Sequence, residues 1–188
     1  PPIDMQQQDS YFVVAHFHMV MGVAPIMVIF GAIYHWYPLM TGRMFHEGLA
    51  KFHFWTTFIG AYTIFLPLHY LGFLGVPRRY FEMGETTFIP DSAQSLNAFV
   101  TVVVLLVGFA QIVFFYNVIR SMTKGAPAGH NPWKATSLEW QTPEVPPGHG
   151  NFGPDLPLVY RWAYDYGVPG AKEDYVPQNM HPDQVVKA

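Results

Sequence analysis

The sequence predicts an all-α membrane protein with three transmembrane helices and an extended C-terminal tail. Of the 188 residues, 51% are apolar and only 12% are charged, against about 25% in a typical soluble domain. Charged residues are absent from three long stretches, 11–37, 52–76 and 96–119. Each stretch exceeds the roughly 20 residues that an α-helix needs to cross the hydrocarbon core of a bilayer, so each is predicted to span the membrane.

The first ten residues are a polar segment that leads into the first predicted span. This span covers about residues 11–37 and is predicted to end at Pro38, because proline cannot continue a helix comfortably. Pro25 lies inside the span and is predicted to kink it, which membrane helices tolerate where neighbouring groups satisfy the freed backbone. Because this span crosses the membrane once, residues 1–10 and 38–51 are expected at opposite surfaces, the outer and the inner one.

The second and third spans are predicted at about residues 52–76 and 96–119, and Pro67 is expected to bend the second. Together with their loops, the three spans form a transmembrane portion of residues 11–120. The remaining residues, 121–188, are rich in proline and glycine but also carry tryptophan and tyrosine. Such a tail is expected to be extended and packed onto a protein surface.

The distribution of basic residues predicts the orientation of the chain in the membrane. One side carries five of them: Arg43, Lys51, Arg120, Lys124 and Lys134. Lysine and arginine are enriched in cytoplasmic loops, so the 38–51 loop and the tail are expected to face the cytoplasm or the mitochondrial matrix. Arg78 and Arg79 lie on the opposite side, against this bias, which makes them candidates for binding a specific anion.

The composition also excludes several kinds of site and partner. The chain has no cysteine, which excludes disulfides, zinc–thiolate sites and iron–sulfur clusters. The net charge of −3 comes without a basic stripe, so no nucleic-acid partner is expected. Because the chain begins with Pro-Pro rather than Met, it is expected to be the C-terminal piece of a longer or processed polypeptide.

Two histidines, His16 and His18, lie one residue apart inside the first span. Residues two apart on an α-helix are separated by about 200° around its axis. The two side chains are therefore expected on opposite sides of the helix, where they cannot chelate one metal but can each hold a separate one. Imidazole is the usual axial ligand of haem iron. The pattern predicts a helix between two haems, with Phe17 between the two redox centres.

Two other interpretations of the histidines remain open. Both members of the pair could form hydrogen bonds with neighbouring helices. Alternatively, an antiparallel hairpin could bring His16 level with His69, and His35 level with His53, as a b-type dihaem membrane cytochrome would need. His35 and His53 are also close to the membrane interface, where such residues often serve as anchors.

Charged residues at the outer surface complete the candidate site. Arg78 and Arg79 follow the second span, and arginine pairs with carboxylates, such as haem propionates, in bidentate geometry. Solvation or contact with lipid headgroups is the alternative for this pair. Asp9, with Asp4 nearby, precedes the first span at the same surface. A carboxylate there could ligate Mg²⁺, which prefers oxygen ligands, or could simply end a polar loop.

Six stretches of the sequence carry a more specific pattern: QDSYFVVAHFHMV, YHWYPLMTGRM, KFHFW, LPLHYLGFLGVPRRY, NVIRS and NPWKATSLEW. They resemble the C-terminal part of subunit I of the haem–copper oxidases, most closely bacterial cytochrome c oxidases. The resemblance covers nearly the whole chain, from about residue 3 to the Pro-Gln-Asn near its end. It implies that the three spans correspond to the last three of twelve helices.

The resemblance implies a role for each histidine of the pair. His16 would be the proximal ligand of the high-spin haem at the oxygen-reducing site. His18 would be one axial ligand of the low-spin haem, and Phe17 would lie between the two haems. Both haems are expected to be haem A, and the oxygen-reducing site would also contain the copper ion CuB.

At the outer surface, the resemblance implies that Arg78 and Arg79 bind the haem propionates and that Tyr11 forms a hydrogen bond there. Where the family usually has His-Asp as Mg²⁺ ligands, this chain has Gln8-Asp9. An amide oxygen can ligate Mg²⁺, but Asp9 is the better candidate of the two.

The resemblance also implies that other parts of the active site lie outside this chain. In the family, the three CuB histidines, the tyrosine cross-linked to one of them and the second ligand of the low-spin haem all lie upstream. The chain alone is therefore expected not to reduce oxygen. Its expected partners are the N-terminal part of subunit I, subunits II and III, cytochrome c as the electron donor and membrane lipid.

The resemblance thus implies the haem-ligating C-terminal part of a proton-pumping terminal oxidase that reduces O2 to water. Its expected location is the bacterial cytoplasmic membrane or the mitochondrial inner membrane. Three alternatives remain: a quinol oxidase of the same family, a b-type dihaem electron-transfer protein and a structural membrane subunit without a cofactor. Haem A with a nearby copper would favour the oxidase, and haem B without copper would favour the dihaem protein.

Overall fold

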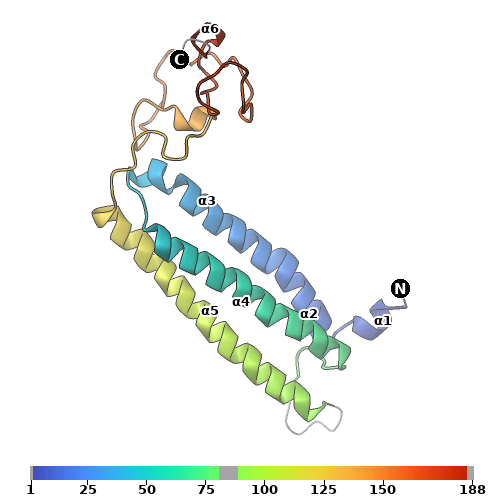
Figure 1. The fold of residues 1–188 in the computed structure, drawn as a ribbon. Coiled ribbons are helices and arrows are strands. Elements are labelled where there is room, and N and C mark those ends of the chain that lie inside the picture. The colour runs from blue at the N-terminus through green and yellow to red at the C-terminus, as the bar shows by residue number, and fades with distance from the viewer. Residues whose placement is uncertain (1, 81–88, 186–188) are drawn as a thin grey trace. The chain divides into compact units, whose positions relative to one another are not determined.

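The computed structural model describes residues 2–80 and 89–185 (Figure 1). In these ranges the regular secondary structure consists of helices, without a strand. The helices are α1 (Asp4–Gln7), α2 (Tyr11–Phe17), the π-helix η1 (His18–Val23), α3 (Ala24–Thr41), α4 (Glu47–Phe73), α5 (Asp91–Lys124), the 3₁₀-helix η2 (Leu138–Trp140) and α6 (Pro182–Val185). The all-α prediction is confirmed for the described residues. The last residues of the predicted tail, 186–188, lie outside them.

Two helices in the described ranges are long and apolar enough to cross a membrane, judged by length and composition. One is the continuous helix Tyr11–Thr41, with 31 residues, which comprises α2, η1 and α3. The other is α5, with 34 residues. Helix α4 has 27 residues and is long enough, but it does not qualify by composition. That α4 also spans the membrane stays a prediction.

The first long helix does not end where the sequence predicted. Helix α3 continues through Pro38 to Thr41. The amide of Gly42 donates to the carbonyl of Pro38 at 2.8 Å, and Thr41 Oγ1 donates to the carbonyl of Tyr37 at 2.8 Å. Gly42 has φ +67°, a left-handed conformation that glycine adopts without a Cβ penalty. The helix therefore ends at this glycine, because proline removes only one donor and the following turn can still form.

Pro25 is accommodated by a change of helix type. The π-helix η1 begins at His18 and ends at Val23, just before Pro25. Proline has no N–H, and its ring would clash with the carbonyl four residues earlier, at Met21. A wider π turn moves this carbonyl away from the ring, and the amide of Ala24 donates five residues back, to the carbonyl of Met19.

The chain divides into two compact units. The first comprises Pro1–Ala32 and His46–Val118, and the second comprises Ile33–Phe45 and Ile119–Ala188. In the first unit, the long helix that begins at Tyr11 (the N-terminal helix), α4 and α5 lie side by side (Figure 1). Close approach depends on glycine: a Cβ at Gly72 of α4 would overlap the backbone of Phe12, and a Cβ at Gly60 would overlap the side chain of Val107 in α5.

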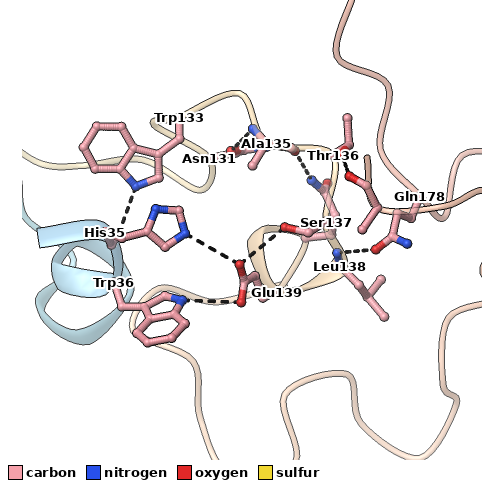
Figure 2. Close-up of polar contacts among 12 residues, drawn as sticks. His35, Trp36, Asn131, Trp133, Ala135, Thr136, Ser137, Leu138, Glu139 and Gln178 are labelled. Atoms are coloured by element: carbon pink, nitrogen blue, oxygen red, sulfur yellow. Dashed lines mark hydrogen bonds and ion pairs between the residues drawn. The ribbon is translucent and has the colours of Figure 1, made fainter. Parts of the chain in front are cut away.

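The second unit contains most of the tail, which is extended apart from η2 and α6. Figure 2 shows how η2 and the residues before it contact the end of α3. Trp133 Nε1 donates to the carbonyl of His35 at 2.9 Å. Glu139 Oε2 accepts a 3.4 Å hydrogen bond from Trp36 Nε1, and Glu139 Oε1 lies 3.7 Å from His35 Nε2. Trp140 is buried, with 1% of its surface exposed, and its ring meets the His35 ring edge-on.

Candidate functional site

A cavity in the first unit is lined by only one of the two histidines of the pair. The cavity has a volume of about 810 Å³ and is lined by the N-terminal helix, α4 and α5. His18 lines it, whereas His16 and Phe17 do not. His16 is exposed, and its side chain forms no hydrogen bond with any described residue. The two histidines thus lie on different faces of the helix, as the spacing of two residues predicts.

The ring of His18 is held in one orientation by its own helix. Its Nδ1 lies 2.7 Å from the carbonyl oxygen of Val14. A carbonyl only accepts hydrogen bonds, so Nδ1 must carry the proton, and Nε2 of the neutral ring is left as an unprotonated lone pair. The ring stacks on Phe65 of α4, with 5.4 Å between the ring centroids and 13° between the ring planes. It also stacks on Phe17, with 4.4 Å between the centroids and 30° between the planes. Histidines that bind a metal through Nε2 have this tautomer when their Nδ1–H donates to a backbone carbonyl.

The wall of the cavity is mainly apolar. Valine, isoleucine, leucine, methionine and phenylalanine side chains make up most of it, and the polar groups are few: Tyr11, Asn97, Thr57 and Gln111, besides His18. Its volume falls in the usual range for small-molecule and cofactor sites, about 300–1,000 Å³. A flat, largely apolar ligand that needs one nitrogen donor would fit this chemistry, and haem is such a ligand.

The segment before α2 and the segment after α4 are tied together at one end of the first unit. The amide of Tyr11 donates to the carbonyl of Val76 at 3.0 Å, and the amide of Arg78 donates to the carbonyl of Asp9 at 2.8 Å. Ser10 and Pro77 form an isolated antiparallel bridge between these two bonds. Tyr11 also lines the cavity, so this pairing holds the arginine segment near the cavity.

The two arginines of this segment have different surroundings. Arg78 Nε lies 2.8 Å from Asp9 Oδ1, an ion pair in which the N–H does not point along a hydrogen bond. The Arg78 side chain is 28% exposed. Arg79 is exposed, has a left-handed φ of +62° and forms no ion pair with the described residues.

Two residues near the cavity were missed by the sequence analysis. Tyr11 Oη donates to Tyr80 Oη at 3.1 Å, and Asn97 Nδ2 lies 3.5 Å from the same oxygen. Asn97 lines the cavity together with Tyr11. The position of Tyr80, directly after the two arginines, was the only signal in the sequence. Nothing in the spacing indicates that Asn97 of α5 meets it, because this contact depends on tertiary structure.

The other histidines of the first unit have protein partners of their own. His69 Nδ1 donates to the carbonyl of Phe65 at 2.7 Å, and the His69 ring packs edge-on against Phe12 rather than His16. His53 is buried, with 1% exposure, and its Nε2 lies 3.1 Å from Gln111 Oε1. Neither His53 nor His69 lines the cavity. In the second unit, His35 faces Glu139 (Figure 2).

The residues predicted to bind Mg²⁺ do not assemble such a site in the described part of the chain. Asp9 faces Arg78, and Gln8 is exposed. No group of three histidine or acidic side chains suited to a metal ion occurs within residues 2–80 and 89–185. That Asp9 or Gln8 ligates Mg²⁺ in a complete protein stays a prediction.

Comparison with known proteins gives one family. The family model described as "Cytochrome C and Quinol oxidase polypeptide I" matches residues 1–106. The chain is 68% identical, over 180 residues, to "Alternative cytochrome c oxidase subunit 1" of Bradyrhizobium diazoefficiens; the match covers 96% of this chain and 30% of the relative. It is 40% identical over 167 residues to "Cytochrome c oxidase subunit 1" of Synechocystis sp. (89% of this chain, 29% of the relative) and 41% identical over 172 residues to that of Thermostichus vulcanus (92% and 30%). The chain thus spans about 30% of the length of these curated relatives.

Proposed function

The chain belongs to the cytochrome c and quinol oxidase polypeptide I family, and we propose that it acts as the haem-ligating C-terminal part of the catalytic subunit of a terminal oxidase. The whole enzyme would reduce O2 to water, pump protons and take electrons from cytochrome c. The names of three similar relatives, all cytochrome c oxidase subunits, favour cytochrome c over a quinol as the donor.

His18 would hold the iron of the low-spin haem inside the cavity. The observation that carries this proposal is the combination of an apolar cavity of about 810 Å³ with a histidine on its wall whose Nδ1 is already anchored to Val14. The anchor leaves Nε2 unprotonated and fixes the ring plane, so little side-chain entropy is lost when a ligand binds. Haem, once bound, supplies one-electron redox chemistry.

His16 would hold the iron of the high-spin haem on the opposite face of the same helix. Its exposure and its lack of a hydrogen-bond partner among the described residues support this assignment, since a histidine inside a membrane helix needs a partner of some kind. Phe17 would then separate the two haems. CuB would be ligated by the part of the catalytic subunit that this chain does not include.

Arg78, Arg79 and Tyr11 would bind the haem propionates at the outer end of the cavity. Tyr11 lines the cavity, and the backbone pairing of residues 9–11 with 76–78 brings the Arg78 segment close to it. A guanidinium group beside a carboxylate stabilises it by charge and by paired N–H donors. These residues would orient the cofactor and tune its potential.

The remaining parts of the proposal concern the assembly. The partners would be the N-terminal part of subunit I, subunits II and III, and membrane lipid, and both haems would be haem A. The tail would face the cytoplasm or matrix, in the bacterial cytoplasmic membrane or the mitochondrial inner membrane.

The low-spin haem assignment can be tested with a matched pair of variants in the complete complex. His18→Ala should abolish the low-spin haem absorption band, whereas His69→Ala should retain it. His69 is a suitable control because its Nδ1 is bonded to the backbone in the same way, but its ring does not line the cavity. A normal low-spin band in His18→Ala would overturn the assignment and would favour a structural subunit. Loss of the band in His69→Ala would favour the dihaem arrangement.

A further inference from the structure

We propose that Asp9 is a positioning residue that holds the guanidinium group of Arg78 by the ion pair at its Nε and leaves its terminal nitrogens to a carboxylate of the cofactor. This inference rests on the proposed function, because it takes a haem propionate to lie at this end of the cavity. It assigns Asp9 a role that acts through Arg78, distinct from the Mg²⁺ ligand that the sequence predicted.

The backbone fixes Asp9 and Arg78 opposite each other. The amide of Arg78 donates to the carbonyl of Asp9, and the Ser10–Pro77 bridge and the bond from Tyr11 to Val76 continue the pairing. Asp9 itself has φ +57°, a left-handed conformation that is uncommon outside glycine but that aspartate tolerates better than most residues. Because the main chains are held together at the pair and through the two residues that follow Asp9, the backbone keeps the two side chains close to each other.

Among the described residues, Arg78 has a charged partner only at its Nε. Asp9 Oδ1 approaches Nε at 2.8 Å. The two terminal nitrogens form no hydrogen bond with any residue in the described part of the chain. An arginine presents five N–H donors in a rigid fork, and the edge formed by its terminal nitrogens can bind a carboxylate in bidentate fashion. A second carboxylate, supplied by a ligand, would therefore complete the pairing.

The contrast with Arg79 supports a specific role for Asp9. Arg79 is exposed, and no acidic residue in the described ranges pairs with it. Arg78, at 28% exposure, is partly withdrawn from water, so its orientation is restricted, whereas the Asp9 carboxylate is 67% exposed. An exposed ion pair alone stabilises a protein little. The physical effect of Asp9 is therefore expected in the orientation of Arg78 more than in the stability of the fold.

The test uses the complete complex and follows the midpoint potential of the low-spin haem by spectroelectrochemical titration. Asp9→Asn removes the charge that holds Arg78. If Asp9 acts by positioning, Arg78 interacts more weakly with the propionate in this variant, and the midpoint potential of the haem falls. We expect a change in the reduction equilibrium of up to about tenfold, which corresponds to about 59 mV for a one-electron couple. If Asp9 acted only as a nearby negative charge, its removal would raise the potential.

Three further variants make the result specific. Asp9→Glu should restore most of the potential. Asp4→Asn removes the same charge from α1, where the exposed Asp4 side chain forms no ion pair with any described residue, and should leave the potential unchanged. In an Arg78→Gln background, Asp9→Asn should produce no additional shift, because the residue through which it acts is gone.

The outcomes separate this inference from the function on which it rests. A rise in potential in Asp9→Asn, or a shift of equal size with and without Arg78, would overturn the positioning role. A Mn²⁺ probe that binds the parent complex and is lost in Asp9→Asn would overturn it in favour of metal ligation. If Arg78→Gln leaves the potential unchanged, the propionate contact itself fails, whatever Asp9 does.

Discussion

A single hydrogen bond to its own helix holds the His18 ring in an orientation suited to binding a ligand. The bond from Nδ1 to the carbonyl of Val14 fixes both the tautomer and the ring plane, and stacking on Phe65 restricts the ring further. A typical hydrogen bond contributes only about 1 kcal/mol to stability, so its main effect here is on the orientation of Nε2. His16, two residues away, has no such anchor in the described residues.

This difference leads to a prediction for His16. His16→Ala should abolish oxygen reduction in the complete complex, because the proposed high-spin haem loses its protein ligand, while the low-spin haem stays reducible through His18. Oxygen consumption and reduced-minus-oxidised spectra would be recorded on the same membranes. Loss of both haems to the same extent would contradict the assignment of one histidine to each haem.

Arg78 gives a second prediction at the scale of single residues. Arg78→Gln should lower the midpoint potential of the low-spin haem, because it removes a positive charge beside the proposed propionate and so disfavours the added electron. An effect on the order of 1–3 kcal/mol is expected from the loss of a charge-assisted hydrogen bond. Redox titration measures the shift. A potential equal to that of the parent would show that Arg78 is not near the propionates.

The long helices could be predicted from the sequence, but their ends and some of their contacts could not. The three charge-free stretches predicted three long helices, but their ends depended on local details. Gly42 rather than Pro38 ends α3, since one missing donor does not stop a helix and a left-handed glycine does. The opposite placement of His16 and His18 was predictable because it follows from helix geometry. The contact of Tyr80 with Tyr11 and Asn97 was not, because it joins three separate elements.

Gly72 provides a prediction about how α2 and α4 pack. Gly72→Ala should destabilise the complex by about 1–3 kcal/mol, because the added Cβ would overlap the backbone of Phe12, which cannot move as a side chain can. Gly31→Ala in α3 is the control, since a Cβ there meets nothing within 4 Å. Thermal loss of the haem spectrum would report stability. Equal stability of the two variants would mean that the helices do not approach this closely.

At the scale of the whole molecule, the number of membrane spans decides where the two ends lie. Three spans put the N-terminal segment and the tail on opposite sides of the membrane, whereas two would put them on the same side. The chain has no cysteine, so a single one can be introduced at Ile3 or at Leu156, which are 70% and 80% exposed.

We expect an impermeant thiol reagent to label Ile3→Cys from the outer side and Leu156→Cys from the cytoplasmic or matrix side. This expectation depends on the prediction that α4 is a third span, since only the helices Tyr11–Thr41 and Asp91–Lys124 qualify by length and composition. Labelling of both positions from the same side would show that α4 does not span the membrane.

We propose that one helix ligates two haems through opposite faces, and optical spectroscopy of the complete complex can show whether it does. Spectra of His16→Ala and His18→Ala would be compared with the parent, with separate bands for the high-spin and low-spin haem. We expect a reciprocal pattern: His18→Ala loses the low-spin band and keeps the high-spin one, and His16→Ala does the reverse. If either variant retains both bands, or if the two variants lose the same band, the claim is wrong.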